Sequence, residues 1–354
     1  MKYRTFPGSD VTVSEVGFGM WTVATGWWGN KTDDEAVRML HKAFDRGVTL
    51  YDAADTYGDG RSEDLLLKAF GDRRDRVVYA TKFGYDWYNH SGERKGQMEI
   101  AQDWSVKHAK FALEQSLKRL GTDVIDIWQL HNLRMETIER DDLWRFLEDI
   151  VREGKVKIVG VALGPAIGWL YEGIRSIEKR RVKCLQIIYN LLEQHPGREQ
   201  IDAGRDNETG YLIRVPHSSG MLEGKYTKDT VFPENDHRRH RPRSWLVNGV
   251  QKVETISFLT DGTGRTLGQA ALKWLLAEPL IMSCLPNIYD DEQLEEFAAA
   301  CETPDLTREE LARVEALWKT NFGVDEPPMK FKGTMESDQT PPPLPQEELR
   351  GAAH

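Results

Sequence analysis

A carboxylate and a phenol lie five residues apart in this chain, Asp52 and Tyr57, and both residue types can take part in proton transfer. They follow an apolar run at 48–51 that is typical of a buried strand, and the Gly-Asp-Gly sequence at 58–60 marks a turn. A phenol can donate a proton to a reacting oxygen when a neighbouring charge supports its ionised form. Equally, Asp52 could cap the turn while Tyr57 covers the end of the strand.

Four more polar residues stand at the carboxyl ends of short apolar runs that predict strands: Lys82, His131, Gln186 and Arg214. In a barrel of parallel strands these ends converge on one mouth, where barrel enzymes build their sites. Residues that served only as caps or in surface ion pairs would be scattered between both ends of the strands. The shared location therefore favours catalysis over the structural interpretation of Asp52 and Tyr57.

The elements that must position these residues follow from the apolar pattern. Eight short apolar runs alternate with helix-like stretches or long loops, which predicts an α/β fold with a (β/α)8 TIM barrel behind an N-terminal hairpin at 2–14. Residues 83–102 lack periodicity and are expected to form a loop. Ser62 is the expected N-cap of a helix at 63–70. Further helices are predicted at 33–44, 105–120, 143–152, 167–177, 267–276, 291–300 and 308–318.

Composition limits the classes of partner. A net charge of −10 argues against nucleic acid or an anionic membrane as the main partner. The three cysteines lack CxxC spacing, and no run approaches the ~18 apolar residues of a membrane span, so a cytoplasmic protein is expected. His237 and His240 lie among arginines, and no metal site is predicted. We expect one barrel domain over 1–325 and an extended proline-rich tail over 326–354.

Each polar residue at the predicted mouth has a possible role. Lys82, buried beside Tyr57, would favour the phenolate and so help the hydroxyl release its proton. Asp52 would keep that lysine charged, and a neutral His131 could hydrogen-bond the substrate oxygen and orient it. None of these side chains is a strong nucleophile. A carbonyl that gains a proton also needs a hydride, so a nicotinamide is the economical cofactor.

Several motifs, in the same order, resemble those of the aldo-keto reductase family over roughly residues 1–320. They are GFG at 17–19, YDAADTYG at 51–58, ATK at 80–82, SLKRLGTD at 116–123, IDIWQLH at 125–131, QIIYNLL at 186–192 and GMLEGKY at 220–226. The resemblance implies NAD(P)H-dependent reduction of an aldehyde or ketone without metal. It implies a catalytic tetrad in which Tyr57 is the proton donor: Asp52, Tyr57, Lys82 and His131.

The resemblance also implies where cofactor and substrate lie. Cofactor contacts are expected at Gly19, Met20, Trp21, Asp52, Gln186, Arg214, Val215, Pro216, Ser218, Gly220, Leu222, Pro286, Asn287, Tyr289 and Gln293. Substrate contacts are expected at Trp21, Tyr57, Trp87 and His131. Aromatic residues in the loops after the first and third strands suit a small sugar-like or aromatic carbonyl.

The chain departs from the family pattern at three places. Ala162 and Leu163 replace the serine and asparagine that bind the nicotinamide carboxamide, which leaves Gln186 for that role. Arg214 stands where an aromatic ring often stacks on the nicotinamide. Acidic residues at 290–292 stand where a basic residue often binds the adenosine 2′-phosphate, which favours NAD. The basic segment 236–243, by contrast, could contact the cofactor's phosphates. The choice between NAD and NADP therefore stays open.

Two other functions stay open from the sequence. A cofactor-sensing binding subunit would carry the tetrad without turnover. An isomerase or epimerase of a sugar would cycle a bound cofactor with no net change in NADH, and the altered residues Ala162, Leu163 and Arg214 leave room for it. The sequence indicates neither the oligomeric state nor the physiological substrate.

Overall fold

The fold is that of a computed structural model, which describes residues 1–90, 99–233 and 236–338. Part of the predicted loop, 91–98, and the proline-rich part of the predicted tail, 339–354, lie outside the described residues.

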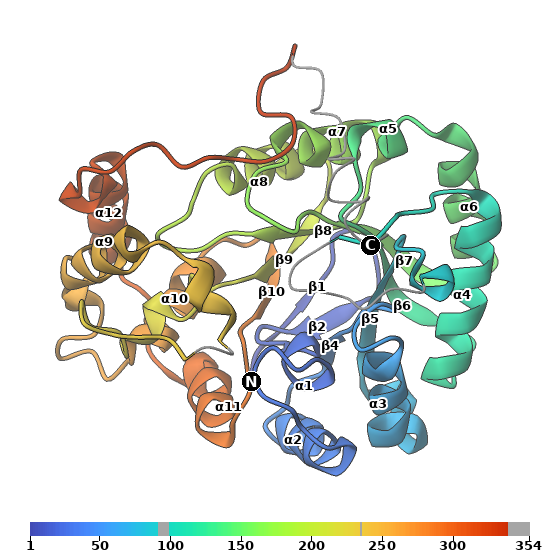
Figure 1. Cartoon of the computed structure of the whole chain (residues 1–354), viewed down its shortest axis with the longest axis horizontal. Helices are drawn as coiled ribbons and strands as arrows, with labels where there is room; N and C mark the ends of the chain where they lie inside the picture. Colours follow the sequence, from blue (N-terminus) through green and yellow to red (C-terminus); the bar gives the residue numbers. More distant parts are fainter. Residues whose placement is uncertain (91–98, 234–235, 339–354) are drawn as a thin grey trace.

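Eight parallel strands surround one apolar interior, and each pairs with its neighbour in the sequence (Figure 1). A backbone bridge from Val16 to Cys284 brings the first strand of the sheet against the last, with Gly17 N–H donating to Cys284 O at 2.9 Å. The predicted (β/α)8 barrel is therefore confirmed. The strands are β3 Phe18–Gly19, β4 Leu50–Asp52, β5 Val78–Phe83, β6 Ile125–His131, β7 Val156–Ala162, β8 Cys184–Ile188, β9 Gly210–Arg214 and β10 Ile281–Leu285.

Helices pack around this barrel. They are α2 Asp33–Asp45, α3 Arg61–Phe70, α4 Val106–Leu120, α6 Asp141–Arg152, α7 Leu170–Arg180, α8 Gly197–Arg205, α10 Leu267–Leu276, α11 Asp291–Ala298 and α12 Arg308–Lys319. Sequence patterns missed α9 Arg243–Glu254, which follows the basic segment, and the single-turn helices α1 Trp21–Ala24 and α5 Met135–Ile138.

The prediction that Ser62 caps α3 is wrong. The N-cap is Gly60, whose φ of 92° lies in the left-handed region that glycine adopts without strain. Ser62 already belongs to the helix, and its hydroxyl donates to Ala54 O at 2.8 Å and accepts from Ala54 N–H at 3.3 Å. The serine therefore ties α3 to the turn that carries Tyr57.

The N-terminal hairpin closes the end of the barrel opposite the strand exits. Its strands, β1 Tyr3–Thr5 and β2 Thr12–Ser14, bury the side chains of Phe6, Val11 and Val13 in the barrel interior. The Arg4 guanidinium donates to the carbonyls of Leu276, Glu278 and Ile281 at 2.6 to 2.9 Å.

The barrel interior consists of an apolar layer and, above it, a polar layer. The apolar layer comes from six successive strands: Leu50, Ala80, Ile127, Ile158, Cys184 and Leu212. Side chains two residues apart on a strand point to the same face. The next inward residues toward the strand exits are Asp52, Lys82, Gln129, Gly160, Gln186 and Arg214, so polar side chains fill the upper layer.

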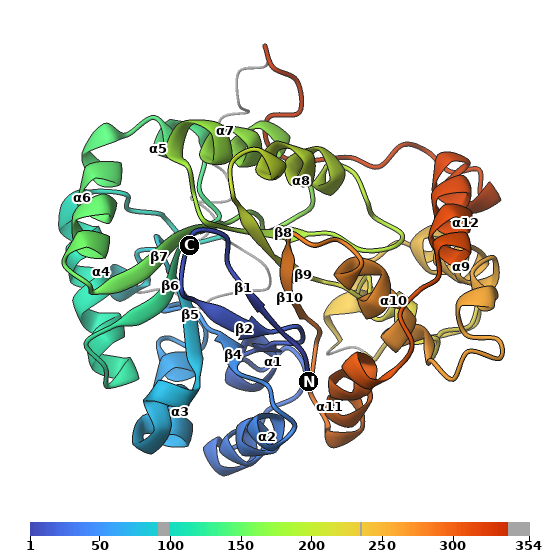
Figure 2. The ribbon, with the colours of Figure 1, turned by 180° about the vertical axis from the view of Figure 1, so that it is seen from behind.

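The chain after α12 crosses the barrel's periphery to reach α7, as Figure 2 shows. Glu326 pairs with Lys252 of α9 at its start. Further on, Trp169 N–H donates to Lys332 O at 2.7 Å, and the Thr334 hydroxyl donates to the buried Glu172 carboxylate at 2.9 Å. Residues 332–334 are therefore docked by specific bonds at the start of α7.

The docking can be tested with a pair of glycines of equal backbone conformation. Gly333 has a φ of 74°, and a Cβ there would overlap the Trp169 ring; Gly323 has a φ of 73° with open space around it. Both alanine variants should lose about 1 kcal/mol from the left-handed backbone. Only Gly333→Ala should expose Lys330 and Lys332 to faster tryptic cleavage, and equal cleavage rates in the two variants would contradict the docking.

Candidate active site

The structure brings the four residues of the predicted tetrad together at the strand exits. Lys82 Nζ donates to Asp52 Oδ2 at 2.6 Å and to Ala53 O at 2.7 Å. The same nitrogen lies 4.8 Å from the centroid of the Tyr57 ring, and that ring meets the His131 ring edge-on at 5.7 Å. The four side chains belong to β4, β5, β6 and the turn after β4, so only the folded barrel assembles them.

The turn after β4 holds Tyr57 in place. Asp55 N–H donates to Lys82 O at 3.2 Å, which anchors the turn to the end of β5. Gly58 has a φ of 61°, and a Cβ there would lie 2.5 Å from Ala24 O, so the position requires glycine. Arg61 then donates to Val23 O at 2.9 Å and Lys31 O at 2.7 Å, fixing the far side of the turn.

The ammonium of Lys82 is buried and stays charged. Burial opposes that charge, but the neighbouring Asp52 and Tyr57 outweigh it and raise the pKa of Lys82 above its usual value. A permanent positive charge beside the phenol favours the phenolate over the neutral hydroxyl.

Two amides bind the second oxygen of Asp52. Gln186 Nε2 donates to Asp52 Oδ1 at 2.9 Å and Gln129 Nε2 donates to the same oxygen at 3.1 Å. Gly160 leaves room for the Gln129 side chain, because a Cβ there would lie 3.1 Å from Gln129 Cγ. Sequence reasoning missed Gln129, although a polar residue on the same strand face as His131 in a wholly buried strand was a usable signal.

Gln186 was expected to bind the nicotinamide carboxamide, and its amide nitrogen is instead directed into the barrel. Its amide oxygen accepts no hydrogen bond from the described residues, so it is available to a donor at the mouth. The side chain can therefore hold Asp52 through nitrogen and meet a carboxamide N–H through oxygen.

His131 is buried and neutral. Burial, followed by the positive charges of Lys82 and Arg214, lowers the pKa of His131 well below its usual value. Its Nδ1 has no hydrogen-bond partner among the described residues. Gln102 Nε2 donates to the backbone carbonyls of His131 and Asn132 at 3.0 and 3.1 Å, which fixes the strand end that carries the imidazole.

A second network supports His131 on the side away from Tyr57, and sequence reasoning missed it. The Tyr85 ring meets the His131 ring at 5.1 Å, and the Tyr85 hydroxyl donates to Glu99. Arg134 donates to both oxygens of Glu99 at 3.0 and 2.8 Å and lies 4.1 Å above the Trp169 ring. The charges of Arg134 and Glu99 therefore neutralise each other.

Arg214 extends from the end of β9, past β8, to the loop after β7. Its Nη2 donates to Leu163 O at 2.6 Å and Pro165 O at 2.9 Å. Burial lowers the pKa of Arg214, although Tyr57 and Asp52 oppose that effect. The guanidinium thus lies on the same side of the mouth as His131.

Aromatic rings cover the side of the mouth opposite Arg214. Trp21 meets Tyr57 edge-on at 4.9 Å, and Trp28 stacks on Tyr289 at 5.1 Å. The Arg238 guanidinium lies 5.0 Å from the Trp28 ring, so contacts join the loops after β3, β9 and β10. Trp87, expected to contact substrate, stacks on Tyr88 at 4.1 Å, and its contact with substrate stays a prediction.

The expected cofactor contacts fall into two groups. Gly19, Val215, Asn287 and Tyr289 are partly exposed at the strand exits and the following loops, where Pro216, Gly220 and Pro286 also lie. Met20 and Leu222 are buried in apolar clusters, Gln293 donates to Glu223 at 3.1 Å, and Ser218 donates to Glu193 at 3.0 Å. In the structure these four side chains contact other parts of the protein, and their part in cofactor binding stays a prediction.

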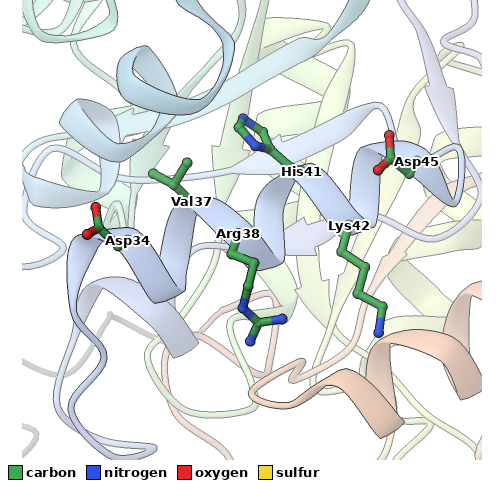
Figure 3. Close-up of a pocket in the computed structure, with 6 residues that line it drawn as sticks. All are labelled: Asp34, Val37, Arg38, His41, Lys42 and Asp45. Carbon is green, nitrogen blue, oxygen red and sulfur yellow. The ribbon is translucent and has the colours of Figure 1, made fainter.

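A pocket on the outer face of α2 is separate from this mouth (Figure 3). It is lined by Asp34, Val37, Arg38, His41, Lys42 and Asp45, none of which belongs to the predicted site.

Within residues 1–90, 99–233 and 236–338, no three His, Cys, Asp or Glu side chains gather as a metal site requires. No helix in the same ranges is long and apolar enough to cross a bilayer.

The model of the Aldo/keto reductase family matches residues 15–319. The chain belongs to this family. It is 31% identical to the aldo-keto reductase yakc [NADP(+)] of Schizosaccharomyces pombe, over 82% of this chain and 84% of the relative. It is 28% identical to the L-glyceraldehyde 3-phosphate reductase of Escherichia coli K12, over 89% of this chain and 92% of the relative. These matches identify the chain as an oxidoreductase of the family, whose members use nicotinamide cofactors.

A solved structure agrees with this assignment. The glycerol dehydrogenase AKR11B4 of Gluconobacter oxydans superposes with a TM-score of 0.78 at 25% identity, covering 93% of this chain and 98% of that chain. The similarity therefore extends over the whole barrel.

The neutral state of His131 should affect stability as the pH falls. Because the folded protein keeps this histidine unprotonated, the unfolded chain binds one more proton below about pH 6.5, and stability present above that pH is lost below it. Between pH 7.5 and 5.5 the loss should be about 1 kcal/mol. His131→Gln should remove that part of the pH dependence in urea denaturation. His217, whose pKa burial lowers to about 4, is the matched comparison and should give the same result.

The bond from Gln129 to Asp52 can be tested by a double-mutant cycle. Gln129→Leu removes a donor from a buried carboxylate and should lower the free energy of unfolding by about 2 kcal/mol. In an Asp52→Asn background the charge is absent, so the same change should cost clearly less. Equal costs in both backgrounds, measured by urea denaturation, would show that Gln129 acts through packing alone.

Proposed function

We propose that the chain reduces an aldehyde or ketone to an alcohol with NAD(P)H, and that Tyr57 donates the proton. The observation that carries the proposal is the buried Lys82 ammonium, which is ion-paired with Asp52 at 2.6 Å and lies 4.8 Å from the Tyr57 ring centroid. A phenol with no such neighbour would hold its proton too strongly to protonate a carbonyl oxygen at neutral pH.

The residues divide the work of this reaction. The Tyr57 hydroxyl gives its proton to the carbonyl oxygen as negative charge develops there, and the Lys82 ammonium stabilises the phenolate that forms. Asp52 keeps Lys82 charged and fixes its position. His131, neutral, donates or accepts one hydrogen bond at the substrate oxygen and so orients the carbonyl toward Tyr57.

The residues at the mouth fit a nicotinamide dinucleotide, which when bound supplies the hydride. The amide oxygen of Gln186 can accept from the carboxamide N–H, whereas Ala162 and Leu163 offer no polar side chain. The loop at 215–220 and the residues at 286–289 would hold the rest of the cofactor.

The acids after β10 do not decide between the two dinucleotides. Asp291 pairs with Arg38 at 3.0 Å and Lys42 at 3.4 Å, and Glu292 lies 3.8 Å from Lys225. Asp290 caps α11 by accepting from Gln293 N–H at 2.8 Å. Local partners therefore offset the repulsion expected for a 2′-phosphate, and one relative carries NADP(+) in its name. NADH and NADPH are to be compared side by side.

The substrate is proposed from the relatives and the shape of the site. The Escherichia coli relative is named for L-glyceraldehyde 3-phosphate, and the Gluconobacter oxydans structure is a glycerol dehydrogenase. These names support a small polar carbonyl compound, or the corresponding alcohol in the reverse reaction. The cytoplasmic location and the absence of a nucleic-acid partner stay predictions.

Tyr57→Phe tests the mechanism directly. It removes the proton donor and keeps the ring, so turnover should fall by about 10² to 10⁴ while dinucleotide binding is retained. Consumption of NADH and NADPH measures turnover on a panel of small sugars and aldehydes, and quenching of tryptophan fluorescence measures binding. Equal turnover in the variant and the natural protein would refute the role of Tyr57.

The same assay separates the two other functions. A cofactor-sensing subunit would bind dinucleotide and consume none with any carbonyl. An isomerase or epimerase would convert substrate, followed by NMR, with no net change in NADH. Either result would replace the reductase proposal.

A further inference from the structure

The guanidinium of Arg214 is held in a fixed position at the mouth. The side chain crosses from β9 to the loop after β7, where Nη2 uses its donors on Leu163 O and Pro165 O. Gly164, between those two residues, makes room for it, since a Cβ there would overlap Nη2. The position is therefore set by the backbone of a loop rather than by an ion pair.

Most of the donor capacity of Arg214 is unused. Of the five N–H groups of a guanidinium, those on Nε and Nη1 have no acceptor among the described residues. Nε is fully buried without a partner, while the side chain as a whole is partly exposed at the mouth. Nη1 is not among the buried unpartnered atoms, so its two N–H groups reach the mouth and can donate to a ligand.

The charge of Arg214 is also unbalanced. Lys82 is paired with Asp52, Arg134 with Glu99, and His131 is neutral. Among the described residues Arg214 forms no salt bridge; the Asp52 and Glu99 carboxylates act on it without bonding to it, and each is paired with another cation. Arg214 thus has no direct countercharge among the described residues, in a chain whose net charge is −10.

We propose that Arg214 binds an anionic group of the substrate, a carboxylate or a phosphate on the carbonyl compound that the site reduces. This inference rests on the proposed function, since it names the substrate class of that site. A guanidinium binds carboxylate and phosphate through charge-assisted hydrogen bonds, and a substrate anion supplies the missing negative charge. The substrate is an oxo acid or a phosphorylated aldehyde rather than a neutral sugar.

The cofactor's diphosphate is the other source of an anion, and the position of Arg214 argues against it. Beyond the nicotinamide, the residues expected to hold the cofactor and its diphosphate follow β9 and β10, at 215–222 and 286–293. The guanidinium points the opposite way, to Leu163 and Pro165, and its charge acts on His131, which meets the substrate oxygen. It therefore acts where substrate is oriented.

The test compares a charged with a neutral substrate of the same shape. Reduction of succinate semialdehyde and of its methyl ester is to be measured with the natural protein, Arg214→Met, Arg214→Lys and the control Arg152→Met, an exposed arginine on α6. The ratio of kcat/KM for acid over ester should fall at least tenfold in Arg214→Met, mainly through KM. Arg214→Lys keeps the charge and should give an intermediate ratio, and Arg152→Met should not change it. NADH and NADPH affinities, from fluorescence quenching, should stay within twofold in all variants.

A binding measurement keeps the inference testable if turnover itself fails. Calorimetric titration of the Tyr57→Phe protein with succinate should show binding that is weakened at least tenfold by adding Arg214→Met. An acid-to-ester ratio unchanged by Arg214→Met would overturn the inference, as would a loss confined to dinucleotide affinity, which would assign the guanidinium to the cofactor. If the natural protein reduces neither compound while the Tyr57→Phe protein still binds succinate through Arg214, that result would refute the reductase proposal and leave the inference about Arg214 standing.

Discussion

The site depends on the countercharge and hydrogen bonds that keep one buried ammonium, that of Lys82, stable inside the barrel. Lys82 is almost fully buried, and a buried charge is tolerated only when it is paired and hydrogen-bonded. Asp52 supplies the countercharge, and Gln129 and Gln186 supply donors for the carboxylate oxygen that Lys82 does not reach. Each group satisfies the next, so removing one leaves a buried polar atom without a partner. The role proposed for Tyr57 needs this arrangement, because only a lysine that stays charged would stabilise its phenolate.

The strand exits could be predicted from the sequence because the information is local. Alternation along a strand places Asp52 above Leu50 and Lys82 above Ala80 on the inward face, whatever the distant chain does. The helices with strong apolar stripes follow from the same kind of pattern. Ser62 was misassigned because the helix begins one residue after Gly60, whose left-handed backbone carries no periodic signal.

Other parts of the site depend on contacts between distant segments, and no local pattern reports them. Tyr85, Glu99 and Arg134 form one network although Glu99 lies 14 residues from Tyr85 and 35 from Arg134 in the sequence. The helix α9 follows a basic segment and a proline, so its pattern is masked by its surroundings. Gln129 differs from these, because it stands two residues before His131 in an apolar run and so on the same face of the predicted strand. Its partner, Asp52, lies 77 residues away and becomes evident only in the folded barrel.

Arg214 and His131 are best understood together. Lys82 and Arg214 both contribute positive charge that, with burial, keeps His131 neutral, so the imidazole serves as a hydrogen-bonding group rather than as an acid. The backbone gives Arg214 its direction: Val215, a β-branched residue, has a φ of 56°, and Asn190 Nδ2 donates to its carbonyl at 3.1 Å. Strain of this kind persists only where the surroundings enforce it, and here it turns the chain sharply after the arginine. An anion bound to Arg214 would offset one of the positive charges that act on His131. In the proposed reaction, the residue that would select the substrate therefore also acts on the electrostatics of the residue that would orient it.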